Sequence, residues 1–140
     1  MNLLNIVCEH FSSPDMAHKL DMIAEFGGGF ELWFQMETIV ALIDSEIYAS
    51  VIGKTGFDAD IIVRDCEREL GVELRCGSTR NINNAFVDHP NSDLYLFLLR
   101  NAYEAFPKLC KQIVDRDYNH KKINSDWILV LSKNSDTSKN

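Results

Sequence analysis

The residues of this chain that could do chemistry fall into short, incomplete groups. Gly53-Lys54-Thr55 has the residue types that end a phosphate-binding loop, in which backbone amides surround a phosphate and a lysine contacts it. That loop needs a further glycine at the position of Tyr48, so we do not expect a nucleotide there. Gly27-Gly28-Gly29 lacks the spacing of a dinucleotide-binding fingerprint, and we interpret it as a joint between two helices.

The stretch from Asp115 to Asp126 has some of the residues of a calcium loop. Carboxylates stand at its first, third and twelfth positions, and Asn119 supplies an amide at the fifth. The sixth position needs a glycine for the sharp turn, and here it is His120. A helix end followed by a polar turn is the better interpretation.

The cysteines do not form the close ligand pairs of a zinc site. Cys8 and His10 make one loose pair, whereas Cys66 and Cys76 stand far apart and Cys110 is separate. We therefore predict no metal and no cofactor, and we interpret the cysteines as reduced, small apolar residues.

No arrangement for nucleophilic or acid–base catalysis is complete. The four histidines occupy no recognisable catalytic loop, and the paired carboxylates Asp58/Asp60 and Asp115/Asp117 are of the kind that helix ends collect. Because every motif is incomplete, we do not expect an enzyme, although partners distant in sequence remain available for an unrecognised site.

The charge of the chain is negative and uneven. Its net charge is −7, and residues 1–60 hold ten Asp and Glu against Lys19 and Lys54, which gives −8 and leaves +1 for residues 61–140. A surface of this sign repels nucleic acid and anionic membranes and attracts a basic protein. With no signal-peptide pattern at Met1, we expect a cytoplasmic protein that binds neither nucleic acid nor membrane directly.

The longest apolar-rich run, Glu31–Gly53, predicts one long central helix. Leu32, Met36, Ile39 and Ile43 recur at steps of three and four, and other apolar residues widen this surface. A strand over Phe30–Met36 is the competing interpretation, because apolar and polar residues alternate there.

The other elements are predicted mainly as helices. The apolar pattern favours them over Asn2–Phe11, from Pro14 to Phe26 with Ser13 as the cap, over Ala59–Leu70, from Ser92 to Phe106, and from Lys108. Gly77–Asn84 is predicted as a loop, and short strands are predicted at Val72–Cys76 and Trp127–Leu131.

These elements predict a mainly α fold, with five or six helices around the central one and one or two short strands. An α+β domain is the alternative, if Asn2–Cys8 and Phe30–Met36 are strands. We expect a single globular domain over residues 1–132 and a polar tail over residues 133–140.

Charge and missing motifs together favour a protein-binding module, specifically a small acidic inhibitor of a basic partner such as a nuclease toxin. Bacterial immunity proteins have this general character. The candidate contact residues are Glu31, Glu37, Asp44, Glu46, Asp58 and Asp60.

The alternative is a small-ligand domain or an enzyme with an unrecognised pocket. Gly27–Gly29, Asn81–Asn84 and His89-Pro90 are the loops that would border such a pocket. The sequence does not specify the partner or the oligomeric state.

Overall fold

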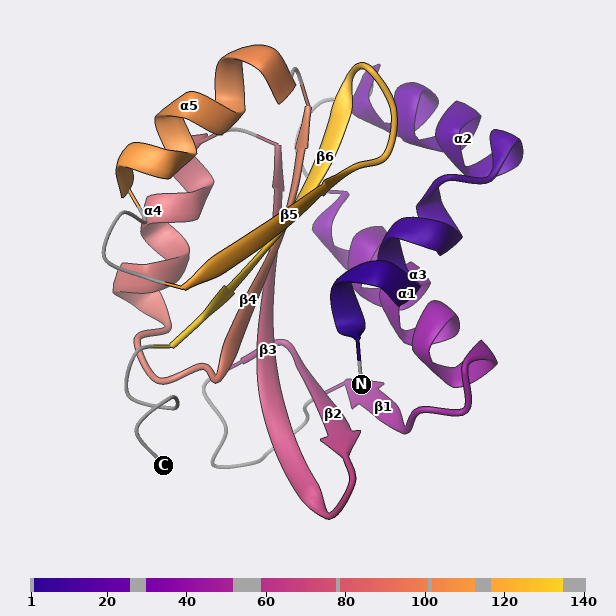
Figure 1. The fold of residues 1–140 in the computed structure, drawn as a ribbon, viewed down its shortest axis with the longest axis vertical. Coiled ribbons are helices and arrows are strands. Elements are labelled where there is room, and N and C mark those ends of the chain that lie inside the picture. The colour runs from indigo at the N-terminus through magenta and orange to yellow at the C-terminus, as the bar shows by residue number, and fades with distance from the viewer. Residues whose placement is uncertain are drawn as a thin grey trace.

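A six-stranded mixed sheet forms the middle layer of the protein in the computed structural model (Figure 1). The spatial order of the strands is β1-β2-β3-β4-β6-β5, with β3 and β4 parallel and every other neighbouring pair antiparallel. The strands are β1 (Ala49–Val51), β2 (Ile61–Asp65), β3 (Arg68–Gly77), β4 (Leu94–Arg100), β5 (Tyr118–Lys122) and β6 (Trp127–Lys133). The structure describes residues 2–25, 30–51, 59–77, 79–100, 102–112 and 117–134.

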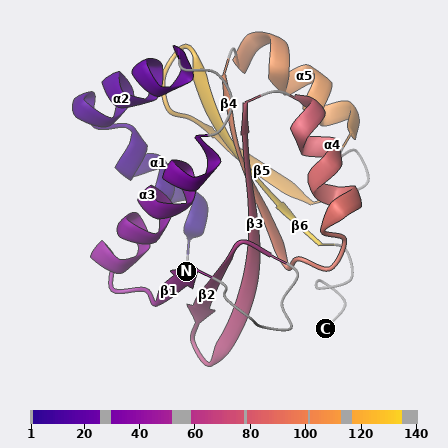
Figure 2. The ribbon, with the colours of Figure 1, turned by 180° about the vertical axis from the view of Figure 1, so that it is seen from behind.

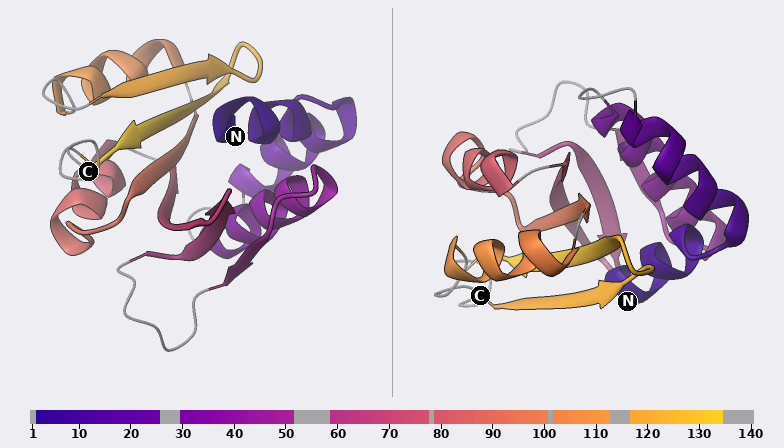
Figure 3. Two further views of the ribbon diagram at one scale, coloured as in Figure 1. Left: turned by 60° about the horizontal axis from the view of Figure 1, so that its bottom comes forward. Right: turned by 90° about the horizontal axis from the view of Figure 1, so that it is seen from above.

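Helices cover both faces of this sheet, as the views from behind and from above show (Figures 2 and 3). On one face lie α1 (Leu3–Phe11), α2 (Pro14–Glu25) and α3 (Glu31–Asp44). On the other lie α4 (Thr79–Asp88) and α5 (Ala102–Gln112). The sheet therefore has two hydrophobic cores, one on each side.

The sequence of β4 explains why the sheet was not predicted. The run from Leu94 to Leu99 (LYLFLL) is buried on both faces, so its apolar residues do not alternate with polar ones. Periodicity alone cannot distinguish a buried strand from a buried helix in a short, continuous apolar run. The prediction of a helix from Ser92 to Phe106 is wrong over β4, and a helix begins only at Ala102.

The predicted helix over Ala59–Leu70 is also wrong, because this segment is a β-hairpin. Asp65 pairs with Arg68, and Cys66 has a positive φ of 57° in the two-residue turn between them. Ile61, Ile62 and Val63 are β-branched residues, which fit a pleated strand better than a helix. Over this short window the apolar residues also fit a helical period.

The predicted central helix is correct only for its first part, and it does not organise the fold. Helix α3 ends at Asp44, where Glu46 adopts a positive φ of 62° and the Ile47 amide donates to the Leu42 carbonyl. The chain then turns into β1. Gly53, the predicted end of the helix, lies outside the described residues.

The fold class is therefore mixed α/β, and the predicted mainly α, helical architecture is wrong. The α+β alternative depended on strands over Asn2–Cys8 and Phe30–Met36. These segments are not strands, because all their residues except Asn2 and Phe30 lie in α1 and α3. The predicted loop Gly77–Asn84 largely forms α4.

Other predictions are confirmed. Helix α1 lies within Asn2–Phe11, and α2 begins at Pro14 with the Ser13 hydroxyl accepting from the Met16 amide at 3.3 Å. The two predicted strands lie within β3 and β6. Within the part of the chain that the structure describes, no helix has the length and apolarity to cross a membrane.

Truncating Leu98 to alanine should destabilise the protein by about 2–5 kcal/mol, because its side chain is fully buried in the middle of the sheet. Urea unfolding followed by circular dichroism measures this change. The matched control is Val87→Ala on the exposed surface of α4, which should change stability by less than about 0.5 kcal/mol. Equal effects of the two substitutions would contradict the position of β4 in the sheet.

Candidate carboxylate site

Strand β3 carries two charged residues, Glu73 and Arg75, in the interior of the protein. Side chains alternate along a strand, so Val72, Leu74 and Cys76 join the core beneath α1, α2 and α3. Glu73 and Arg75 therefore point to the face that α4 covers. The side chain of Glu73 is only 1% exposed, which is unusual for a carboxylate and requires a local explanation.

Asp60 is held beside Glu73 by the backbone of β3. Its amide donates to the Val72 carbonyl at 3.1 Å, and its Oδ2 accepts from the Leu74 amide at 3.0 Å. The register of β2 with β3 begins at Ile61 opposite Val72, so Glu73 lies just past the last paired residue. Two carboxylates thus meet where β2 and β3 separate.

Basic side chains lie around this pair. Arg75 Nε is 3.0 Å from Glu73 Oε1, and Arg75 Nη1 is 4.0 Å from Glu31 Oε2 at the start of α3. His89 Nε2, just after α4, is 3.7 Å from Glu73 Oε1. We call Asp60, Glu73 and Arg75 the carboxylate site, with Glu31 and His89 at its edge.

The electrostatics of the site favour a neutral Glu73. Burial, and after it the negative charge of Asp60, raise the pKa of this carboxyl from 4.5 to about 8 against the opposing effect of Arg75. No hydrogen-bond partner for Glu73 Oε2 exists among the described residues while the group is ionised. A proton on Glu73 can be shared with Asp60, which satisfies both carboxyls at neutral pH.

Cys76, beside Arg75 on β3, is unsuited to nucleophilic chemistry. Its thiol is buried, and burial together with the charge of Glu31 raises its pKa well above the ordinary value. Since the thiolate is the nucleophile, this cysteine is inert at neutral pH. That matches its interpretation as a small apolar residue.

The donors of the site suit a hard cation better than a zinc ion. Among the described residues, no group of three or more His, Cys, Asp and Glu is placed to hold a metal. Zinc sites need three or four such ligands. Magnesium, in contrast, keeps several waters and is commonly held by one or two carboxylates together with the phosphates of a substrate.

The candidate contact residues predicted from charge lie in several different places. Asp60 belongs to the carboxylate site and Glu31 to its edge. Glu37 Oε2 lies at hydrogen-bond distance, 2.7 Å, from Nε2 of His10 and accepts from it. Asp44 and Glu46 are exposed at the far end of α3. Asp58 lies outside the described residues, so the six residues do not share one described surface.

Two of the other groups considered for chemistry have local structural roles in the described part of the chain. Asn124 Oδ1 accepts from the amides of Asp126 and Trp127, which closes the turn between β5 and β6. Cys8 Sγ lies 3.7 Å from the hydroxyl of Ser12, the residue that follows α1. Asp115, Gly27–Gly29 and Gly53-Lys54-Thr55 lie outside the described residues.

No family model, no curated protein and no solved structure matches this chain.

Sequence reasoning missed Glu73 and Arg75, although a signal was present. Val72–Cys76 was predicted as a strand, and two charged residues two apart in such a strand share one face. With β3 in the middle of the sheet, that face is necessarily covered. Asp60 was selected for its charge alone, and its proximity to Glu73 depends on the β2–β3 register.

The raised pKa of Glu73 makes stability depend on pH. The folded state keeps a proton that the unfolded state loses above pH 4.5, so the free energy of unfolding falls as pH rises from 4.5 to about 8. We expect a contribution to that fall of at most about 1.4 kcal/mol per pH unit. Glu73→Gln, which keeps the shape of the neutral carboxyl, should remove this contribution.

Urea unfolding at pH 5, 6, 7 and 8 measures the effect. Glu46→Gln, at an exposed carboxylate, is the matched control and should keep the wild-type pH profile. An unchanged profile in the Glu73→Gln variant would show that Glu73 is ionised throughout this range.

Proposed function

We propose that the protein is a hydrolase of phosphate esters that uses a divalent cation, held by Asp60 and Glu73. The observation that carries this proposal is the buried Glu73 Oε2, which has no hydrogen-bond donor among the described residues when it is ionised and lies beside a second carboxylate. A cation between the two carboxylates would take the place of the shared proton. It would also remove the repulsion that keeps Glu73 neutral.

The surroundings supply the other parts that such chemistry needs. A cation bound to two carboxylates keeps positions open for water and for a phosphate oxygen, and it lowers the pKa of the bound water. The guanidinium of Arg75 is a planar donor with several N–H groups, suited to a second phosphate oxygen. Glu31, 4.0 Å from Arg75, helps to hold that side chain in place.

This proposal differs from the expectation that the chain is not an enzyme, which rested on the absence of a contiguous motif. Asp60 and Glu73 are thirteen positions apart in the sequence. Such a pair forms no motif until the two strands are in register. The overall negative charge is compatible with a phosphate substrate, because the local charge of a cation and Arg75 governs binding at the site.

The first test is hydrolysis of bis(p-nitrophenyl) phosphate and p-nitrophenyl phosphate with Mg²⁺ or Mn²⁺, together with calorimetric titration of Mn²⁺ alone. We expect hydrolysis that requires the cation, and release of a proton when Mn²⁺ binds at pH 7, because Glu73 must ionise. Asp60→Asn and Glu73→Gln should each weaken Mn²⁺ binding at least about 100-fold.

The control is Asp44→Asn, an exposed carboxylate away from the site, which should bind Mn²⁺ as the wild type does. Binding of Mn²⁺ that is equal in all four proteins, or no binding at millimolar concentration, would overturn the proposed site. The Glu73→Gln protein is expected to fold, since glutamine is close in shape to the neutral side chain.

A second candidate function, binding of a basic protein, is favoured by the outer surface of α3. Leu32, Met36, Val40 and Ile43 follow one another along this helix and are each 44–65% exposed. We call these four residues the docking face; Asp44 and Glu46 lie exposed at its end. Exposed apolar residues in a row mark an interaction surface, and the adjacent carboxylates favour a partner of positive charge.

The docking face is tested with a Leu32→Ser/Val40→Ser variant in affinity capture from host lysate. A basic protein that the wild type retains, that this variant loses and that a Val87→Ser control retains would support the candidate. Its association rate should fall by about tenfold or more between low and high salt. Retention that does not depend on the docking face or on salt would contradict it.

A further inference from the structure

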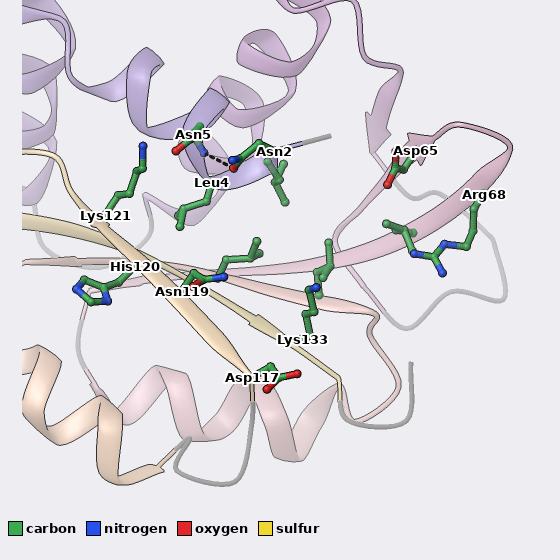
Figure 4. Close-up of a pocket in the computed structure, with 14 residues that line it drawn as sticks. Asn2, Leu4, Asn5, Asp65, Arg68, Asp117, Asn119, His120, Lys121 and Lys133 are labelled. Carbon is green, nitrogen blue, oxygen red and sulfur yellow. Dashed lines mark hydrogen bonds between the residues drawn. The ribbon is translucent and has the colours of Figure 1, made fainter. Parts of the chain in front are cut away.

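A cleft of about 910 Å³ opens on the side of the molecule that carries α1. Figure 4 shows α1 above it, β5 and β6 below it, and the β2–β3 turn at one end. Five leucines line its apolar part: Leu3, Leu4, Leu70, Leu94 and Leu131. Its volume falls in the range of sites for small ligands and exceeds the space that a single ion needs.

Three basic side chains contribute to this cleft from three strands. Arg68 comes from the start of β3, Lys121 from β5 and Lys133 from β6 (Figure 4). All three are exposed, and none makes a side-chain hydrogen bond or ion pair in the part of the chain that the structure describes. Unpaired basic residues around one cleft are notable in a protein of net charge −7.

The start of α1 adds to the positive potential of the cleft. Asn2 caps this helix by accepting from the Asn5 amide at 3.1 Å, and the first turn holds no acidic residue. Leu3 and Leu4, at the positive end of the helix dipole, also line the cleft. The helix dipole and the three basic side chains therefore both make the potential in the cleft more positive.

Acidic and neutral groups complete the lining. Asp65 and Asp117 are the carboxylates of the cleft, so its formal charge is +1 with His120 neutral. The ring of His120 packs on Phe106, with centroids 4.3 Å apart, and so belongs mainly to the α5 side of β5. Carboxylates beside an anion site can accept hydrogen bonds from ligand hydroxyl groups.

We propose that this cleft binds a phosphorylated small molecule with an apolar body, of the size of a nucleoside diphosphate. The phosphates contact Arg68, Lys121 and Lys133, and the body lies on the leucines. Asp65 and Asp117 accept from hydroxyl groups. None of these residues belongs to the carboxylate site, so the inference does not depend on the proposed hydrolase activity.

The test is isothermal titration of the full chain with three probes: ADP, pyrophosphate and adenosine. We expect ADP to bind at least tenfold more tightly than adenosine, because only ADP reaches the basic residues. It should also bind more tightly than pyrophosphate, which makes no contact with the parts of the leucines that reach the cleft. Binding should weaken as salt is raised.

Charge-reversal variants locate the site. Lys121→Glu and Lys133→Glu should each weaken ADP binding at least tenfold, whereas Lys19→Glu, an exposed lysine of α2 outside the cleft, should leave it unchanged. All the substituted residues are exposed, so the variants should keep the wild-type circular dichroism spectrum. Loss of ADP binding with Lys19→Glu as well would indicate a general charge effect and overturn the site.

Two further results would overturn the proposal. No binding of ADP at millimolar concentration would exclude a ligand of this class. Pyrophosphate binding as tightly as ADP would exclude a role for the leucines. Because Asp60→Asn leaves this cleft intact, ADP binding in that variant separates the two sites experimentally.

Discussion

The parallel pairing of β3 with β4 is the constraint on which the rest of the structure depends. Both strands lie in the middle of the sheet and have covered faces, so their backbone groups must be satisfied by neighbouring strands. Parallel neighbours need a crossover connection, and the segment containing α4 supplies it. The hairpin partner β2 and the antiparallel β6 then protect the two outer edges of this pair. Helices on both faces bury the side chains that result.

This pairing also explains how a carboxylate comes to lie in the interior. Successive side chains of a central strand point to opposite faces of the sheet, and both faces are covered here. A charged residue on such a strand therefore points toward one of the two cores. Glu73 is tolerated because Arg75 and His89 are close and because the carboxyl can hold its proton. Replacing a whole buried ion pair by apolar residues is often neutral or stabilising, whereas removing one partner leaves the other charge buried and unpaired. Glu73 and Arg75 are therefore expected to depend on each other.

What could be predicted from the sequence was local. The Ser13-Pro14 start of α2 is a helix signal within four residues, and the apolar face of α1 repeats within one short segment. The hairpin from β2 to β3 required a choice between two periods over ten residues, and Ile62, Cys66 and Leu70 fit the wrong one. LYLFLL in β4 has no period at all, because both of its faces are buried.

The carboxylate site could not be predicted for a related reason. Glu73 was identifiable only as a charge in a short strand, and its neighbours come from the register of β2, the end of α4 and the start of α3. The spacing of these residues in the sequence does not show that they lie close to Glu73. Charge counting did select Glu31 and Asp60, but it grouped them with Asp44 and Glu46, which lie elsewhere.

The position of β6 between β4 and β5 has a consequence for synthesis on the ribosome. The partner of one whole edge of β4 is β6 (Trp127–Lys133), which emerges after all the other strands that the structure describes. Until then, β4 presents an apolar edge with unpaired amides and carbonyls, the kind of edge that pairs with other chains. A nascent chain stalled before Trp127 would thus be prone to aggregate, and chaperones that cover apolar strands would protect it.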